Sequence, residues 1–258
     1  MNIFKQLFVS LYSPKDIAAF RNQGIGKTIA FVFILTIFSV MPPAYHFSTT
    51  IKSGIEAFGE TVKGELPPFK IENGTLDSEV DEPVTINKDG FQITLDDTGK
   101  LKGGDIAAQT ENGIGILKHE LVFVTAGQAQ SNPYSILEGF SITSGELEQF
   151  LEKADSALMI VLPVIIVFMY LFTTALNFIK ILFLAVFGMI FKNNLKKNIS
   201  YGHSWRLTAY AITLPTIFFA IMDTFEAVVP LGILISWFVS LVMLYLSIKE
   251  IPENESAK

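Results

Sequence analysis

Three short stretches of this 258-residue sequence contain residue types that could do chemistry. The first, from Gly24 to Thr28, ends in Gly-Lys-Thr, as a phosphate-binding loop does. Such a loop holds phosphate with backbone N–H groups and the lysine, and it needs a further glycine five positions earlier and a preceding strand. Arg21 stands at that earlier position, and no strand is expected before it. We therefore interpret this stretch as a loop at a membrane edge.

The second stretch is Asp97-Thr98-Gly99, which follows an apolar run that ends at Leu95. An Asp-Thr-Gly sequence is typical of aspartic proteases, whose chemistry needs two carboxylates that share a proton. This chain contains the sequence once, so a homodimer would have to supply the second carboxylate. A turn with Asp and Gly in their usual places is the simpler interpretation.

The third stretch, Thr85 to Asp96, can be aligned with a calcium-binding loop because Asn87, Asp89 and Gly90 fall at suitable positions. The first ligand position holds threonine instead of aspartate, and the flanking residues alternate as strands do. Strong ligands of the EF-hand are therefore missing. The pattern favours a β-hairpin with a solvated acidic surface.

A fourth group consists of ionisable or polar residues inside or beside long apolar segments. Asn177 and Lys180 lie about one helical turn apart, and further charged residues flank the segment from 207 to 221, namely His203, Arg206, Asp223 and Glu226. Ionisable groups within a membrane often mark a transport path. All of these lie near expected span ends, where snorkelling to the interface is the ordinary explanation. We keep transport as the alternative.

Cysteine is absent, which excludes disulfides, thiolate nucleophiles and cysteine metal sites. The histidines His46, His119 and His203 form no ligand-spaced pair. The sequence thus offers no catalytic, cofactor-binding or metal-binding residue, and we do not expect an enzyme or a bound cofactor.

The elements that would position these residues are apolar helices. Half of the chain is hydrophobic and only 17% is charged, and the mean hydropathy is +0.44. No Lys, Arg, Asp or Glu occurs in 28–51 or 156–179, and further apolar runs cover 207–221 and 227–248. Charge-free runs of about 20 residues match a hydrocarbon core of about 30 Å. The sequence predicts an α-helical polytopic membrane protein with about four transmembrane helices and an inserted, small β-rich (α+β) extracytoplasmic domain.

The expected organisation follows from these runs and from the charges between them. It consists of cytoplasmic interfacial helices in 1–26, transmembrane helix 1 in 27–47, an acidic extracytoplasmic domain in 48–155, transmembrane helix 2 with an apolar cytoplasmic extension in 156–191, a basic cytoplasmic loop in 192–204, transmembrane helices 3 and 4 in 205–248, and a cytoplasmic tail in 249–258.

The first span should end near Pro42-Pro43. Helix 2 would be too long for one span if it continued to Phe191, since 156–191 extends about 54 Å at 1.5 Å per residue. We expect Lys180 to mark the water interface by snorkelling, while 181–191 is left as interfacial, re-entrant or part of a long helix.

The N-terminus predicts two short helices on the membrane surface or against a partner protein. In the first, an apolar face is formed at helical spacing by Ile3, Phe4, Leu7, Phe8 and Leu11. In the second, Ser13 is the cap and Pro14 lies in the first turn. Gly24 and Gly26 should end the second helix. The first face should pack near Ile181 to Phe191.

Within the inserted domain, short alternating runs predict strands around 69–71, 84–86, 91–95, 106–109, 114–118 and 121–124. Asn87 to Gly90 predicts a hairpin turn, because Asp-Gly tolerates positive φ. Asn112-Gly113 is expected as another break, and Ser144 as the cap of the helix that leads into the second span. Few long aliphatic or aromatic residues occur here, so we expect a thin core.

Charge decides the expected orientation. Before the first span the net charge is +3, between the second and third it is +4, and the inserted domain has 8 Lys and no Arg against 19 acidic residues. Short loops rich in Lys and Arg stay in the cytoplasm. Both termini should therefore be cytoplasmic in the cell membrane.

Ser10 to Lys15 with Arg21, and also Ile71 to Gly74 and Ile93 to Gly99, resemble an uncharacterised membrane family of Gram-positive bacteria, domain of unknown function 1189. Some of its members are labelled maltodextrin utilisation proteins. The segment from Tyr201 to Pro215 is similar, more weakly, to the Yip-type membrane domain. Neither resemblance implies a catalytic residue.

The molecular function is thus unknown from sequence. The leading hypothesis is a non-enzymatic accessory or sensor protein of the cell envelope, which the family label would link to maltodextrin uptake. The alternative is a small oligomeric transporter or channel that uses Lys180, Asp223 and Glu226. The expected partners are the lipid bilayer and a membrane or envelope protein, with no nucleic acid, and the oligomeric state stays open.

Overall fold

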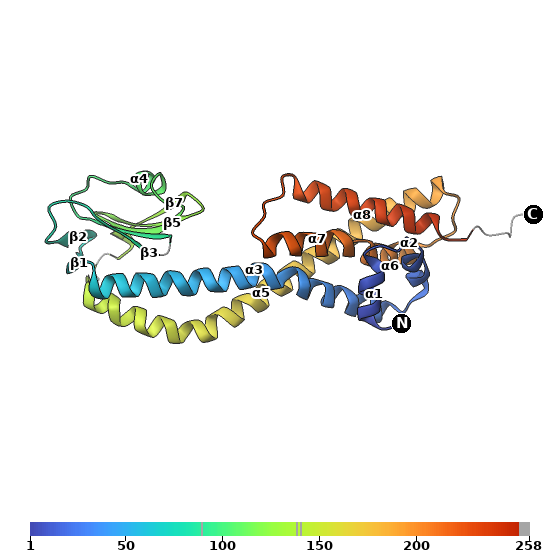
Figure 1. Cartoon of the computed structure of the whole chain (residues 1–258), viewed down its shortest axis with the longest axis horizontal. Coiled ribbons are helices and arrows are strands. Elements are labelled where there is room, and N and C mark those ends of the chain that lie inside the picture. The colour runs from blue at the N-terminus through green and yellow to red at the C-terminus, as the bar shows by residue number, and fades with distance from the viewer. Residues whose placement is uncertain (89, 138, 140, 253–258) are drawn as a thin grey trace, which may run out of the picture. The chain divides into compact units, whose positions relative to one another are not determined.

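The computed structural model describes residues 1–88, 90–137, 139 and 141–252. It divides into two compact units, which we name the helical unit, 1–47 with 163–258, and the β-rich unit, 48–162. The chain passes from the first unit to the second within helix α3 (Ile25–Gly64) and returns within helix α5 (Ser144–Asn194) (Figure 1). Each unit is described below by itself.

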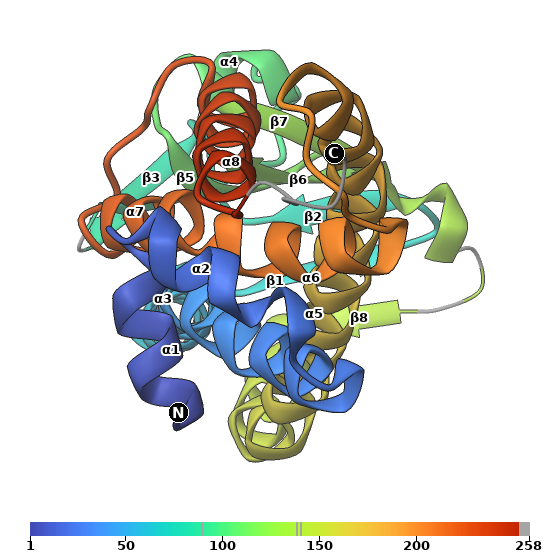
Figure 2. The ribbon, with the colours of Figure 1, turned by 90° about the vertical axis from the view of Figure 1, so that its right-hand side faces the viewer.

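The helical unit contains the parts of α3 and α5 that belong to it and six further helical segments. These are α1 (Ile3–Ser10), α2 (Pro14–Ala19), η1 (Phe20–Asn22), α6 (Tyr201–Ala211), α7 (Thr213–Thr224) and α8 (Gly232–Lys249). Figure 2 views these helices with α1, α2, α6, α7 and α8 nearest the reader. Within the described residues, four helices are long and apolar enough to cross a membrane, namely 25–64, 156–194, 201–224 and 232–249.

The helix that contains the first candidate span continues beyond its proline pair. Helix α3 continues through Pro42 and Pro43 to Gly64. Neither proline has an N–H group to donate to the carbonyl four residues earlier, on Phe38 or Ser39. The helix persists because the loss is confined to these bonds and the turns on both sides are packed, with Val40 5% and Ala44 7% exposed.

Of the three alternatives left open for 181–191, the structure selects the long helix. Helix α5 continues without interruption to Asn194, so 181–191 is part of one long helix. Ile181, Leu184 and Ala185 are each 0% exposed, because this stretch packs into the core of the helical unit.

The third candidate span consists of two helices, α6 and α7, with Ile212 between them. The break follows from Pro215, which cannot donate a hydrogen bond to the carbonyl of Ala211. Helix α6 therefore ends at Ala211, and α7 begins at Thr213 with Pro215 in its first turn.

The two N-terminal helices are confirmed, and the Ser13 side chain accepts a hydrogen bond from the backbone N–H of Asp16 as expected. However, α2 ends at Ala19, and Gly26 lies inside α3. The expected face of α1 is confirmed in part, because Ile3 and Leu7 pack against the core cluster that contains Ile181. Phe4 and Phe8 are each 62% exposed, whereas Val9 is 8% exposed and shares the core of the helical unit with Ile181.

Buried Gln6 explains the rotated face of α1. Gln6 is 1% exposed, and its amide Nε2 donates to Oε1 of Gln23 at 2.5 Å. Gln23 Nε2 in turn donates to the hydroxyl of Tyr210 at 2.8 Å. The Tyr210 ring contacts Phe20 and Phe31, with centroids 4.7 and 4.3 Å apart. A hydrophobic periodicity cannot reveal this polar contact, because Gln6 is buried by its hydrogen bond and not by its hydropathy.

The β-rich unit contains a three-stranded sheet in the order β2-β1-β8 and a five-stranded sheet in the order β3-β4-β5-β6-β7. The strands are β1 (Phe69–Glu72), β2 (Thr75–Ser78), β3 (Val84–Lys88), β4 (Phe91–Asp96), β5 (Asn112–Leu117), β6 (Glu120–Thr125), β7 (Gln128–Pro133) and β8 (Ser141–Thr143). The helix α4 (Gly103–Ala107) and the short η2 (Tyr134–Leu137) complete it. Strands β4 and β5 run parallel, with α4 in their connection, and every other neighbouring pair is antiparallel.

Several strand predictions are confirmed, and the β3–β4 hairpin pairs Val84 with Leu95 and Lys88 with Phe91. Gly90 in its turn has φ +80°, and the predicted turn residue Asp89 lies outside the described residues. The strand expected at 106–109 is wrong, because Ile106 lies in α4 and is completely buried under β6 and β7 in a small cluster. Asn112 and Gly113 begin β5 and are not a break.

The predicted helix start at 144 is confirmed, but the capping side chain is Thr143. Its Oγ1 accepts from the backbone N–H of Glu146 at 3.2 Å, and the Glu146 carboxylate accepts from the backbone N–H of Thr143 at 2.9 Å. This reciprocal pair is a capping box. These hydrogen bonds from Thr143 lower the pKa of the Glu146 carboxyl.

Candidate functional site

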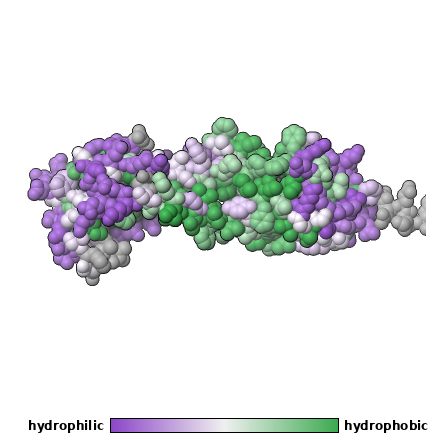
Figure 3. All heavy atoms as spheres, turned by 90° about the horizontal axis from the view of Figure 1, so that it is seen from below, coloured by the Kyte–Doolittle hydropathy of each residue, from purple (hydrophilic) through white to green (hydrophobic). Residues whose placement is uncertain are grey.

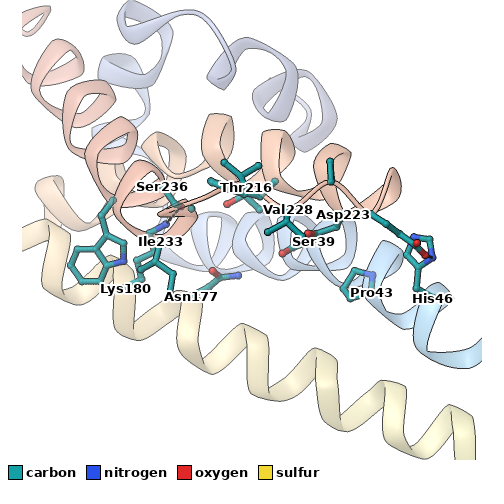
Figure 4. A pocket seen from close by; sticks show the side chains of 16 residues that line it. Ser39, Pro43, His46, Asn177, Lys180, Thr216, Asp223, Val228, Ile233 and Ser236 are labelled. Carbon is teal, nitrogen blue, oxygen red and sulfur yellow. Dashed lines mark hydrogen bonds and ion pairs between the residues drawn. The ribbon is translucent and has the colours of Figure 1, made fainter. Parts of the chain in front are cut away.

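A cavity of about 780 Å³ with both apolar and polar lining residues lies among the candidate spans of the helical unit. Its lining comes from α3, α5, α7, α8 and the connection between α7 and α8 (Figure 4). Apolar residues such as Ile233 and Trp237 make up part of the wall, and polar side chains from all five segments converge on it. A concave site with a few convergent polar groups is the usual form of a ligand-binding site.

Lys180 is the cation at one end of this cavity. Its ammonium Nζ donates to the hydroxyl Oγ of Ser236 on α8 at 2.7 Å. Among the residues that the structure describes, no carboxylate lies within the 4.0 Å of an ion pair with Lys180. The positive charge therefore has a neutral hydroxyl as its protein partner.

Asn177, one turn before Lys180, connects α5 to α3. Its Nδ2 donates to Oγ1 of Thr36 at 3.0 Å, and Thr36 donates in turn to the carbonyl of Val32 at 2.9 Å. Thr36 is 0% exposed. Asn177 and Lys180 thus project toward two different helices, and these hydrogen bonds position the Lys180 side chain in the cavity.

The other end of the cavity carries acidic groups. Nδ1 of His46 lies 2.8 Å from a carboxylate oxygen of Glu226, and Asp223 lines the cavity close by (Figure 4). The C-terminal turn of α7 positions both acids: the backbone N–H of Glu226 donates to the carbonyl of Asp223 at 3.1 Å, and Glu226 has φ +53°. Figure 4 shows Lys180 and Asn177 at one end and His46 and Asp223 at the other.

The sequence-based candidates are therefore partly brought together. Asn177, Lys180, Asp223 and Glu226 line one cavity, although the sequence suggested separate interface anchors. His203 belongs to the N-terminal turn of α6, where its backbone N–H donates to Ser200 Oγ at 3.3 Å.

Arg206 is likewise outside the cavity, since its Nη1 donates to the carbonyl of Arg21 at 3.3 Å. The sequence analysis missed Ser236, Thr36 and the pairing of His46. Nothing in the sequence signals them, because 56 residues separate Lys180 from Ser236 and 141 separate Asn177 from Thr36.

The three sequence motifs have structural roles. The Gly24 to Thr28 stretch begins α3 and follows the short helix η1. Asp97 Oδ2 accepts from the backbone N–H of Ser78 at 2.9 Å and from its hydroxyl at 2.7 Å, which joins two strand ends. Thr85 to Asp96 forms the paired strands β3 and β4. Across the described residues, no cluster of three or more His, Cys, Asp or Glu could hold a metal ion.

The comparisons place the chain in a family. A model of the family described as "Protein of unknown function (DUF1189)" matches residues 4–248. The chain belongs to this family. The match includes both units and every residue of the cavity. Its description mentions neither maltodextrin nor a Yip-type domain. No curated protein and no solved structure matches the chain.

Proposed function

We propose that this chain is a four-span cell-membrane protein without catalytic activity, which binds a small anionic group beside Lys180 and serves as a sensor or accessory subunit of a cell-envelope system. The observation that carries the binding role is the Lys180 ammonium, held in a cavity among apolar helices with a neutral hydroxyl partner.

The apolar surface of the helical unit supports the membrane assignment. In the most hydrophobic 18-residue window of α5, the mean hydropathy is 2.5 and only 6% of the residues are buried. Phe168 and Phe172 are 69% and 67% exposed there. Figure 3 shows a largely hydrophobic surface on the helical unit and a largely hydrophilic one on the β-rich unit. Large contiguous apolar surfaces mark membrane or protein contacts, and the charge-free stretch 156–179 within α5 is long enough for a span.

The charge distribution supports cytoplasmic termini and an external β-rich unit, as the positive-inside rule predicts. The test uses the absence of native cysteine. Single cysteines at the exposed positions Gln130 and Asn194 would be treated with a membrane-impermeant thiol reagent on intact cells. Labelling at position 130 and not at 194 is expected, with labelling of both in lysed cells as the control. The reverse pattern would overturn the topology.

The energetic argument for an anion rests on the cost of a lysine among spans. On insertion scales a central lysine costs about 2.5–3.5 kcal/mol, so such residues are usually paired or functional. Ser236 stabilises the ammonium by one hydrogen bond and supplies no negative charge. An anionic group in the cavity would add the missing charge at short range, where the surrounding apolar helices screen little.

Binding to Lys180 is testable with two named anions that carry the same phosphate chemistry. The purified full chain would be titrated with phosphatidylglycerol in phosphatidylcholine nanodiscs and, separately, with inorganic phosphate. The substitution Lys180→Gln removes the positive charge. We therefore expect the protein to lose at least tenfold in affinity for one of the two anions. Lys180→Arg should retain binding, and Lys192→Gln, outside the cavity, is the matched control.

The two anions distinguish a lipid headgroup from a free solute. Saturation only with phosphatidylglycerol assigns a lipid, and saturation with inorganic phosphate assigns a soluble anion. If the folded wild type binds neither anion, or if Lys180→Gln binds as tightly as wild type, the binding role is wrong.

The accessory role predicts a membrane or envelope partner, and the resemblance noted in the sequence suggests a sugar importer. Mild crosslinking in cells grown with and without maltodextrin, followed by purification and mass spectrometry, would identify it. Enrichment of importer components with maltodextrin would support the specific version. Recovery of no membrane or envelope protein under either condition would refute the accessory role.

A second candidate function is transport, which the two-ended cavity favours. Lys180 lies at one end and Asp223 and Glu226 at the other, an arrangement that would suit a solute with separated charges. Reconstituted protein should then move such a solute into vesicles, and Asp223→Asn should abolish the flux. Absence of any solute or ion flux with the wild type would remove this candidate.

A further inference from the structure

A second cavity, distinct from the one beside Lys180, lies inside the β-rich unit. It has a volume of about 270 Å³ and lies between the two sheets, with walls from β1 and β8 on one side and β5, β6 and β7 on the other. Phe58 of α3 and Leu147 of α5 complete the wall. The lining is apolar except for Asn132 and Tyr134.

Tyr134 gives this cavity its chemical character. The residue is 2% exposed, and its backbone N–H donates to the carbonyl of His119 at 2.9 Å, which fixes the start of η2. Its hydroxyl is buried and has no hydrogen-bond partner among the described residues. Buried hydroxyl groups nearly always have a partner, because desolvation without one is costly. A hydrogen bond to the Tyr134 hydroxyl would therefore need a partner group from a bound molecule.

The size of the cavity is sufficient for an organic molecule. An engineered cavity of about 150 Å³ admits benzene and stays dry, and this one is larger. It is located in the main core cluster of the unit, between Phe69 and Ile71 of β1 and Ile116 of β5. An empty cavity destabilises a domain roughly in proportion to its volume. This thin core would gain stability from an occupant, since a ligand that binds only the folded state shifts unfolding.

The electrostatic surroundings select the charge of the occupant. Burial, and secondarily the negative charge of Glu120, raise the pKa of the Tyr134 hydroxyl, which is therefore a neutral donor at every physiological pH. The same carboxylate repels an anionic ligand. The apolar walls offer no partner to a cation, since none of the lining residues is acidic.

We infer that the β-rich unit binds a small, neutral, largely apolar molecule that carries one hydrogen-bond acceptor, with the acceptor on the Tyr134 hydroxyl. Its hydrocarbon part fills the space between the sheets. This site is independent of the anion site at Lys180, and either can fail without the other.

A matched pair of probes tests the inference on the full chain. Camphor is a compact bicyclic ketone, and camphane has the same skeleton without the carbonyl. Isoleucine methyl groups labelled with ¹³C in nanodisc-embedded protein would report binding, because Ile71, Ile116 and Ile142 line the cavity. Saturable shifts at these methyls are expected, whereas partition into the bilayer would produce non-saturating changes at exposed Ile190 and Ile233.

Wild-type protein should bind camphor about fivefold more tightly than camphane, the effect of one neutral hydrogen bond. Tyr134→Phe should remove this difference and retain camphane binding. Tyr170→Phe is the control, because its hydroxyl bonds to the carbonyl of Phe33 in the helical unit. Leu121→Phe should fill the cavity and block both probes.

Three results would overturn the inference: no saturable shift with either probe in folded wild type, equal affinity for the two probes, or an unchanged camphor preference in Tyr134→Phe. The first two results are measured on the wild-type protein. The inference can therefore be tested even if a variant fails to fold. A Tyr134 hydroxyl satisfied only by water would produce the first of these results.

Discussion

The helical unit and the β-rich unit both bury apolar side chains, but they differ in what they expose. In the β-rich unit Ile93, Leu95 and Ile116 are at most 1% exposed, and acidic residues lie on the surface. In the helical unit small polar residues such as Ser204, Thr208 and Ser247 are 0% exposed, while large apolar residues face outward. The difference teaches that the outer surface is largely apolar on the helical unit and largely polar on the β-rich unit.

Two of the buried hydroxyls in the helical unit are satisfied by hydrogen bonds within their own helices. Thr208 Oγ1 donates to the carbonyl of Ser204 at 2.8 Å, and Ser247 Oγ donates to that of Met243 at 2.7 Å, each four residues earlier on the same helix. Each hydroxyl is satisfied without water, as a membrane interior requires. Small side chains also let helices approach closely.

The largest expected effect separates the two surfaces directly. Phe172→Asp on α5 should lower membrane insertion and protein abundance strongly, because a central Asp costs about 2.5–3.5 kcal/mol in lipid. Phe123→Asp on β6, where the side chain is 42% exposed, is the matched change on the water-exposed surface and should cost about 0.5 kcal/mol or less. Both variants would be compared by their abundance in cells and by the melting temperature of the detergent-extracted protein. Equal tolerance of the two changes would contradict a lipid-facing α5.

A close helix contact provides the next prediction. A Cβ at Gly188 of α5 would collide with the Ser204 hydroxyl and lie 3.4 Å from Leu244. The Ser204 hydroxyl also donates to the carbonyl of Ala185 at 2.7 Å. Gly188→Val should therefore destabilise the helical unit by about 1–3 kcal/mol through overpacking.

Gly26→Ala in α3 is the control for this contact, because no atom lies within 4 Å of the added Cβ. It should be neutral or slightly stabilising. Thermal unfolding followed by helix circular dichroism compares the two variants, and similar melting temperatures would argue against a tight α5–α6 contact.

In the β-rich unit the sharpest prediction concerns Asp96, which is 0% exposed. Its carboxylate accepts from the backbone N–H of Leu101 at 2.7 Å and of Thr98 at 2.9 Å, and from the Thr98 hydroxyl at 2.5 Å. Burial alone would raise the pKa of the Asp96 carboxyl, but the hydrogen bonds from Thr98, Leu101 and Gly99 together lower it.

Because the folded pKa of Asp96 is below the unfolded one, its stabilising contribution is fully present above the unfolded pKa of about 3.9. The contribution is lost as pH falls through the folded value. Asp96→Asn should reduce stability at pH 7 by about 1–2 kcal/mol and flatten the acid limb of the stability curve below about pH 4. Asp81→Asn, exposed and outside this turn, is the control. An unchanged acid limb in Asp96→Asn would contradict the assignment.

The smallest expected effect concerns the hydrogen bond between Asn177 and Thr36. Interhelical hydrogen bonds in membranes average about 0.6 kcal/mol, so Asn177→Leu should change stability by about that amount. A double-mutant cycle with Thr36→Val isolates the term. A coupling energy of several kcal/mol would indicate that the helical unit depends on polar contacts as much as on packing.

Much of the architecture follows from the sequence. Charge-free runs of about 20 residues located three of the four apolar helices, and the shorter run 207–221 located the third candidate span. Alternation of apolar with polar or small residues located β1, β3, β4, β5 and β6. It missed β7, whose six residues are mostly exposed and polar, and it misassigned Ile106, because one buried isoleucine fits a helix as well as a strand.

What the tertiary structure alone decided is which polar groups meet. Helix α5 continues past Lys180 because packing against α6 and α8 covers Ile181 and Leu184. In the sequence, a single lysine within a helix cannot be distinguished from a lysine at a membrane interface. The pairing of Lys180 with Ser236 and the hydroxyl of Tyr134 in an apolar cavity depend on segments far apart in the chain. Periodicity describes the environment of each element, whereas a site depends on distances between elements, and these are set only when the helices and sheets pack.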